Sequence, residues 1–213
     1  LNPGYLVHDF ATLCRNRLHK HSRTVFVDLG ASLEFHKRNK NSPDSDAYKT
    51  PAVALLELYQ RFGFVFDHVY AYELQPEDPS DVFRAIPDDF KAAYHWYNIG
   101  ATAEERSYRN PFRMIADAFD EDDFVVVKID IDAPWIEIPL AKQLLQPSNN
   151  NNNNNNNSSV LPTDLVDVLY FEHHVAVKEL APFWGDTMVG SIQDSIELFA
   201  GLREQGIAAH YWI

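Results

Sequence analysis

Acidic side chains in this chain follow apolar segments, at the places where strands are expected to end. Asp28 and Gly30 close the first such segment, Glu73 closes the second, and Asp130 and Asp132 close a later one. Open α/β sheets bind their ligands at the carboxyl ends of parallel strands. We therefore expect these side chains to meet at one site.

The first two positions suit a nucleoside. A glycine lets the backbone turn and lets a ligand approach closely, while the carboxylate of Asp28 can fix nearby amides or polar groups of the ligand. Glu73 is placed to accept hydrogen bonds from both hydroxyls of a ribose. Asp28 and Gly30 alone could mark a plain strand-to-loop turn, and Glu73 alone could be a solvated strand end. The turn and the acid together favour ligand binding.

Lys128, Asp130 and Asp132 alternate along one apolar segment, which predicts that they share a face of the strand. Burying these charges is costly unless they are paired. A structural interpretation is an internal Lys–Asp pair that fixes the strand end. We favour a functional one, because the other acids converge on the same edge.

Glu172, His173 and His174 close a fifth apolar segment. A histidine there could act as a general base near neutral pH, or bind a metal together with Asp132. Neighbouring residues of a strand point to opposite faces, so at most one of the two histidines is expected in the site.

These side chains need a sheet to position them. Apolar segments that read as strands alternate with helical patterns that begin at Pro51, near residue 111, at Pro134 and after Ser191. The expected strands are 24–29, 67–73, 93–99, 124–131, 166–172 and 207–213. This alternation predicts an α/β, Rossmann-like fold with a mostly parallel sheet flanked by helices.

Composition narrows the classes of partner. The net charge of −13 argues against nucleic acid, since no excess of cations is present to replace counterions. No apolar run approaches the length that spans a bilayer. The single Cys14 excludes an internal disulfide and a cysteine-rich metal site.

We expect one domain over residues 1–213, interrupted by a disordered asparagine-rich insertion at 148–159 that has little apolar area to bury. Because the chain begins at Leu1 rather than a methionine, we expect it to be cut from a longer product. The sequence indicates neither compartment nor oligomeric state.

The ordered set of motifs resembles the FkbM-type methyltransferases, which are class I enzymes dependent on S-adenosylmethionine. The resemblance covers about residues 24–213 and rests on the segments 25–32, 69–76, 98–100, 127–132 and 169–174. It implies a class I methyltransferase fold and transfer of a methyl group to a hydroxyl of a small molecule or a glycan.

The resemblance also implies roles for individual residues. The cofactor S-adenosylmethionine would be bound by Asp28, Gly30, Ala31, Ser32, Glu73 and Asn98. Among these, Glu73 would hold the ribose hydroxyls and Asn98 would lie near the adenine. Lys128, Asp130, Asp132 and His174 would serve catalysis near the methyl group and the acceptor. This interpretation assigns no metal.

Two alternatives remain open at this point. Asp130-Ile131-Asp132 after an apolar strand also fits the metal and diphosphate site of a nucleotide-sugar glycosyltransferase. A catalytically silent Rossmann-like domain is the other, because Leu33-Glu34-Phe35 stands where the methyltransferase family has a second glycine.

The asparagine-rich insertion gives a first prediction. Replacing residues 148–159 with a short Gly-Ser linker should leave the melting temperature nearly unchanged, because loop length costs little closure entropy. A thermal unfolding scan of both proteins checks this, and a large drop would show that the segment packs on the domain.

Overall fold

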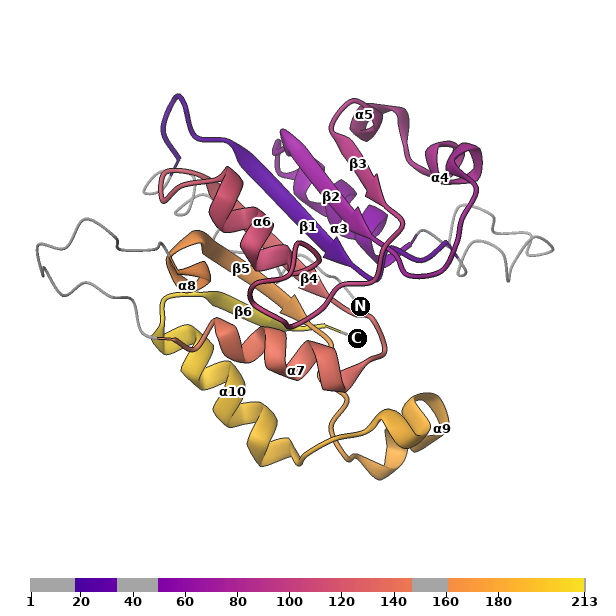
Figure 1. Ribbon diagram of the computed structural model, residues 1–213, viewed down its shortest axis with the longest axis vertical. Helices are drawn as coiled ribbons and strands as arrows, with labels where there is room; N and C mark the ends of the chain where they lie inside the picture. Colours follow the sequence, from indigo (N-terminus) through magenta and orange to yellow (C-terminus); the bar gives the residue numbers. More distant parts are fainter. Residues whose placement is uncertain (1–17, 34–49, 147–160, 213) are drawn as a thin grey trace, which may run out of the picture.

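One sheet of six parallel strands organises the molecule, in the order β3-β2-β1-β4-β5-β6 (Figure 1). The computed structural model describes residues 18–33, 50–146 and 161–212. The strands are β1 (Thr24–Leu29), β2 (His68–Tyr72), β3 (Tyr94–Tyr97), β4 (Phe124–Ile129), β5 (Val166–Phe171) and β6 (Ala208–Tyr211). Every strand pairing among these residues is parallel, so all carboxyl ends lie at one edge.

The central strands are buried along their whole length. Every residue of β1, β4 and β5 is buried. Such strands are covered on both faces and therefore consist of nearly continuous apolar runs rather than of alternating patterns. A polar residue inside one of them needs a partner.

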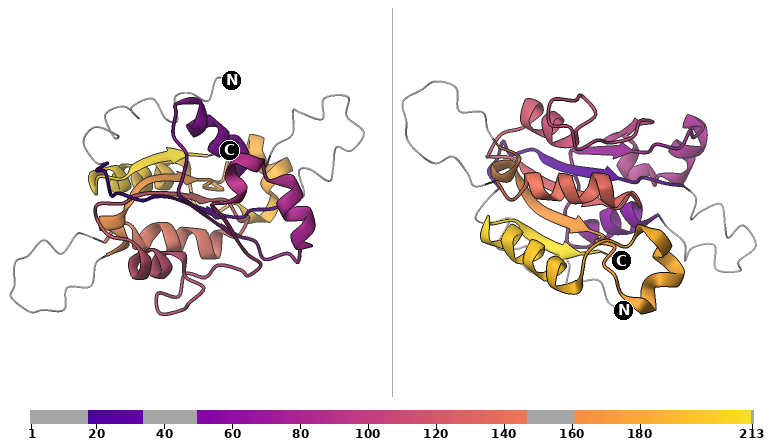
Figure 2. Two further views of the ribbon diagram at one scale, coloured as in Figure 1. Left: turned by 90° about the horizontal axis from the view of Figure 1, so that it is seen from above. Right: turned by 60° about the horizontal axis from the view of Figure 1, so that its bottom comes forward.

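Two sets of helices cover the two faces (Figures 1 and 2). One face packs against α3 (Pro51–Arg61), α4 (Pro79–Ala85) and α5 (Asp88–Lys91). The other packs against α6 (Pro111–Ala118), α7 (Pro134–Gln143) and α10 (Ile192–Glu204). The described residues also form four short helical segments: α8 (Pro162–Leu165), η3 (Lys178–Leu180), α9 (Ala181–Trp184) and η4 (Gly185–Thr187).

The long helices begin where the sequence predicts. Thr50 and Asn110 accept hydrogen bonds from backbone amides in the first turns of α3 and α6, and a proline follows each cap. Ser191 and Asp194 form a reciprocal capping box at the start of α10. These caps satisfy amides that would otherwise lack partners.

The predicted α/β, Rossmann-like fold with a parallel sheet is confirmed. Some strands are shorter than expected: β4 ends at Ile129 rather than at residue 131, and β3 covers Tyr94–Tyr97 rather than 93–99. The Pro- and Asp-rich segment 76–92, where no element was expected, contains the short helices α4 and α5. The insertion at 148–159 falls outside the described residues, and the single domain over 1–213 stays a prediction.

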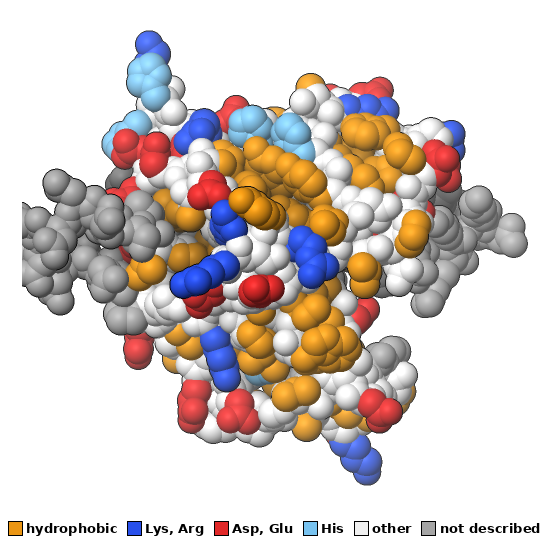
Figure 3. Space-filling model, viewed as in Figure 1, with side chains coloured by type: hydrophobic (Ala, Val, Ile, Leu, Met, Phe, Trp, Pro, Cys, Tyr) orange, Lys and Arg blue, Asp and Glu red, His pale blue; other side chains and the backbone are white. Residues whose placement is uncertain are grey.

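The surface in Figure 3 carries both charged and hydrophobic side chains. Histidine side chains lie at the border of one hydrophobic area. An aromatic row lies on β2 and β3 and consists of His68, Tyr70, His95 and Tyr97. The rings of Tyr70 and His95 in it stack 4.7 Å apart.

Within the described ranges, no helix has the length and apolar character needed to cross a membrane.

Gly30 lies where the chain leaves β1, with a φ of 90°. A Cβ atom at this position would stand 1.7 Å from the carbonyl oxygen of Asp130, so the loops after β1 and β4 touch through the glycine backbone. The amide nitrogen of Gly30 also donates a hydrogen bond to the carbonyl of Tyr72 at the end of β2. Only glycine fits this junction of three strand ends.

Gly30→Ala should therefore lower the free energy of unfolding by about 3–5 kcal/mol, which combines the strain of a left-handed alanine with overpacking. Gly63 is the matched control, because it has a φ of 80° and a Cβ there would meet nothing within 4 Å among the described residues beyond its chain neighbours. Gly63→Ala should cost only the strain, about 1–2 kcal/mol. Urea unfolding measures both, and equal losses would contradict the close contact.

Candidate functional site

A cavity of about 440 Å³ opens at the carboxyl ends of β1, β2 and β4. Its walls come from the loops after these strands and after β3, and from the starts of α3 and α7. The lining residues are Gly30, Ser32, Pro51, Tyr72, Glu73, Leu74, Gln75, Ile99, Gly100, Ala101, Asp130, Ile131, Asp132, Ala133 and Ile136. The volume suits a small organic ligand.

Five of the residues singled out from the sequence line this cavity: Gly30, Ser32, Glu73, Asp130 and Asp132. Glu73 is buried and its Oε1 accepts a hydrogen bond of 2.7 Å from the amide of the residue two positions later. Burial raises the pKa of the Glu73 carboxyl. The structure thus brings the acids of β2 and β4 to one cavity.

Lys128 ties β1 to β4 beneath the cavity. Its fully buried ammonium lies 3.0 Å from Asp28 Oδ1 and 3.0 Å from Asp130 Oδ2. Asp28 and Lys128 are direct cross-strand partners in the register of the two strands. The contacts of Lys128 are thus those of an internal ion pair, and neither Lys128 nor Asp28 lines the cavity.

The two carboxylates of this triad differ in electrostatic state. Burial raises the pKa of Asp28, against the pull of Lys128. Burial also raises the pKa of Asp130, but Lys128 and hydrogen bonds with Glu172 and Trp212 Nε1 hold it below the usual value overall. The second oxygen of Asp28 is buried and has no hydrogen-bond partner among the described residues.

Asn98 and Ala31 lie outside the lining. The side-chain nitrogen of Asn98 donates hydrogen bonds to the carbonyls of Glu73 and Gln75, and its oxygen accepts one from the amide of Glu77. Asn98 therefore shapes the loop after β2. Ala31 is buried in the core.

Asp132 does not continue the alternation that the sequence suggested. Because β4 ends at Ile129, Asp132 belongs to a loop, and its φ of 55° is in the left-handed region. Its side chain is 81% exposed and turns toward His174 rather than Lys128. Asp130 and Asp132 thus have separate partners, which weakens the interpretation of the two as one metal–diphosphate pair.

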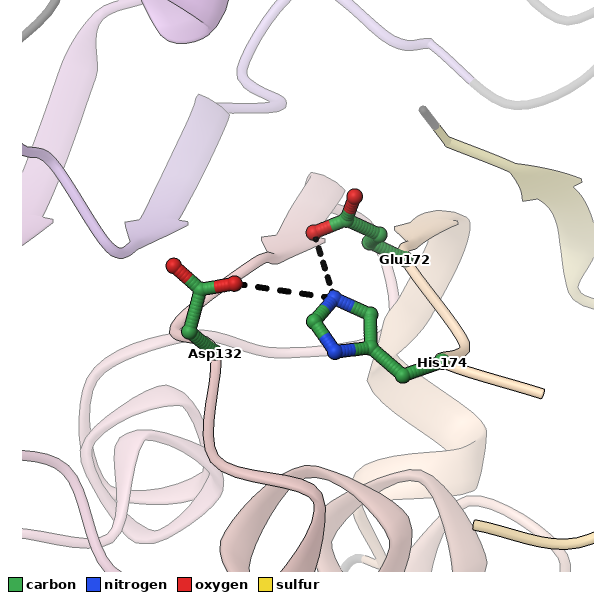
Figure 4. A group of neighbouring side chains, drawn as sticks. All are labelled: Asp132, Glu172 and His174. Atoms are coloured by element: carbon green, nitrogen blue, oxygen red, sulfur yellow. Dashed lines mark ion pairs between the residues drawn. The ribbon is translucent and has the colours of Figure 1, made fainter. Parts of the chain in front are cut away.

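A second cluster lies beside the cavity mouth, where Asp132, Glu172 and His174 point toward one another (Figure 4). His174 Nε2 lies 3.1 Å from Glu172 Oε2 and 3.6 Å from Asp132 Oδ1. Burial opposes protonation of His174, but the neighbouring Glu172 raises its pKa overall. His173, by contrast, stacks on Phe171; both histidines lie beyond the end of β5, so the strand alternation expected from the sequence does not extend to them.

Sequence reasoning missed two residues near the site, Glu137 and Trp184. Glu137 is buried in the first turn of α7, and its Oε1 accepts a 2.7 Å hydrogen bond from the amide of Ile131, which fixes the loop after β4. Burial raises the pKa of Glu137 to about 7. Trp184 stacks on His174 with ring centres 4.5 Å apart and donates to Glu172 Oε1. An acid three residues after a Pro134 helix start could have pointed to Glu137.

Comparison of the chain with protein-family models, with curated proteins and with solved structures gave no match. The structure by itself establishes a Rossmann-like α/β fold with an all-parallel sheet. A fold of this kind hosts many chemistries, so function has to be argued from the cavity and its side chains.

The buried triad gives a prediction about stability. Lys128→Met should lower the free energy of unfolding by about 3–5 kcal/mol, because it leaves two carboxylates facing each other without their cation. Lys142→Met on the exposed side of α7 is the matched control and should change it by less than about 0.5 kcal/mol.

Chemical denaturation measures both variants, and a triple variant isolates the cause. Adding Asp28→Asn and Asp130→Asn to Lys128→Met should recover part of the loss, since the uncompensated charge is removed. A triple variant that is less stable than Lys128→Met alone would contradict this account.

Proposed function

We propose that this protein is an S-adenosylmethionine-dependent methyltransferase that acts on a hydroxyl of a small molecule or a glycan. The observation that carries the proposal is the cavity at the ends of β1, β2 and β4, which is lined by Glu73, the acid that follows β2, together with Gly30. Glu73 provides a hydrogen-bond acceptor for the hydroxyls of a ribose that enters this cavity at the carboxyl edge of the sheet.

The charge of the cavity supports a cationic ligand. Glu73, Asp130 and Asp132 line it, and lysine and arginine side chains are absent from its described lining. Lys128, the buried cation beneath the cavity, is engaged by two carboxylates. Net negative potential favours the positively charged sulfonium of S-adenosylmethionine.

The turn at Gly30, after β1, also argues against a dinucleotide as the ligand. A diphosphate is usually held where a glycine-rich turn leads directly into a helix, whose N-terminus supplies amide donors. Here Gly30 is followed by no further glycine until Gly63, so the sequence lacks the glycine-rich turn. A ligand without a phosphate suits this arrangement better.

Methyl transfer in such a site is mostly positioning of the acceptor oxygen in line with the sulfonium methyl group. Asp130 is a weak candidate for proton acceptor, because Lys128, Glu172 and Trp212 hold its pKa below the usual value against the effect of burial. The cluster of Asp132, Glu172 and His174 reaches the cavity only through Asp132, which lines it.

Isothermal titration calorimetry with S-adenosylhomocysteine tests the cofactor. The wild-type chain should bind it, and Glu73→Ala should weaken binding by about 1–3 kcal/mol through the loss of the hydroxyl partner. Glu73→Gln should weaken it less, because an amide oxygen still accepts a hydrogen bond.

Glu121→Ala is the matched control, since Glu121 is exposed just before the amino end of β4, opposite the cavity. It should bind S-adenosylhomocysteine as the wild type does. Absence of binding to the wild type at millimolar ligand would remove the methyltransferase proposal and favour a silent domain.

A further inference from the structure

The cluster of Asp132, Glu172 and His174 holds a buried nitrogen atom whose surroundings are unusual. His174 is 1% exposed, and its Nε2 has no hydrogen-bond partner within the part of the chain that the structure describes. Its neighbours are two carboxylate oxygens, Glu172 Oε2 at 3.1 Å and Asp132 Oδ1 at 3.6 Å. Figure 4 shows both carboxylates directed at this nitrogen.

The other ring nitrogen defines the tautomer of the neutral imidazole. The Thr187 hydroxyl donates its hydrogen to the carbonyl of Trp184 over 2.7 Å, so toward His174 Nδ1, 2.6 Å away, it can only accept. Nδ1 therefore carries the hydrogen, and Nε2 presents a lone pair. Three electron-pair donors then converge on one small space.

We propose that Asp132, Glu172 and His174 form a binding site for a divalent transition-metal ion, with His174 Nε2 and one oxygen of each carboxylate as ligands. The ligand atoms lie within 4.8 Å of one another, so modest side-chain rotation brings them to a common centre. One imidazole and two carboxylates suit Mn²⁺ or Zn²⁺. This inference replaces the sequence-based expectation of a site without a metal.

The groups around the ligands orient them. Thr187 fixes the ring of His174 through Nδ1, and Trp184 Nε1 donates to Glu172 Oε1 over 3.3 Å. Such outer contacts are typical of metal ligands and tune their basicity. The site would be open on one side, because Asp132 is exposed and also lines the cavity, so three protein ligands leave positions for water or a substrate oxygen.

Metal binding to the full chain tests the proposal without cofactor or substrate. Chelator-treated protein is titrated with Mn²⁺, and free Mn²⁺ is followed by electron paramagnetic resonance; Zn²⁺ is then added as a competitor. The wild type should bind one equivalent of Mn²⁺, and Zn²⁺ should displace it. Absence of stoichiometric binding of either ion at millimolar metal would overturn the site.

Variants separate this site from general attraction of cations to an acidic protein. Asp132→Asn preserves the left-handed backbone, which asparagine tolerates, and should weaken Mn²⁺ binding at least tenfold. Thr187→Val should weaken it about 10- to 100-fold, although it removes no charge and no ligand. Asp122→Asn, in the exposed turn before β4, is the matched control and should have no effect.

Circular dichroism confirms that each variant is folded. Equal Mn²⁺ affinity in the wild type, Asp132→Asn and Thr187→Val would overturn the assignment of these ligands. Binding of S-adenosylhomocysteine, measured separately on the same preparation, tells failure of the metal site apart from failure of the proposed function.

Discussion

The buried ion pairing of Lys128 with Asp28 and Asp130 is the constraint on which the carboxyl edge of the sheet depends. Charges in a strand that is covered on both faces are stable only when they satisfy one another, so the triad fixes the relative position of β1 and β4. The backbone contact between Gly30 and the loop after β4 lies next to it. Together these contacts hold the carboxyl ends of β1 and β4 against each other next to the cavity.

The same pairing divides the acids of this edge into two groups with different capacities. Asp28 and Asp130 share one ammonium, although Asp130 also lines the cavity. Glu73 and Asp132 face the cavity, and Asp132 also faces His174. The cavity is therefore lined by one carboxylate that is paired with Lys128 and by two that lie outside this pairing.

The sequence was sufficient to predict the α/β fold and most of its strands and long helices. Long apolar runs with β-branched residues marked the strands, and Pro51, Pro134 and Ser191 marked helix starts, because these signals are local. The segment 76–92 was not assigned, since α4 and α5 are too short to show a helical period. Convergence of the acids on one edge followed from the parallel topology.

The detailed partners could not be read from the sequence. Strand alternation placed Asp132 beside Lys128, but β4 ends at Ile129 and a left-handed residue redirects the side chain. Asn98 carries a motif position, yet its hydrogen bonds go to the loop after β2. Thr187 gave no signal, because its contact with His174 depends on how the chain folds back after β5. Such contacts depend on tertiary geometry rather than on local pattern.

The hydrogen bond between Thr187 and His174 has an evolutionary consequence. The hydroxyl matters because it accepts from one ring nitrogen while donating to a carbonyl, and among common side chains serine offers the same pair of roles at similar size. Related chains that keep a histidine at position 174 should therefore retain threonine or serine at 187, and chains that lose the histidine should be free to vary there. The two positions are therefore expected to vary together, although they stand 13 positions apart in the chain.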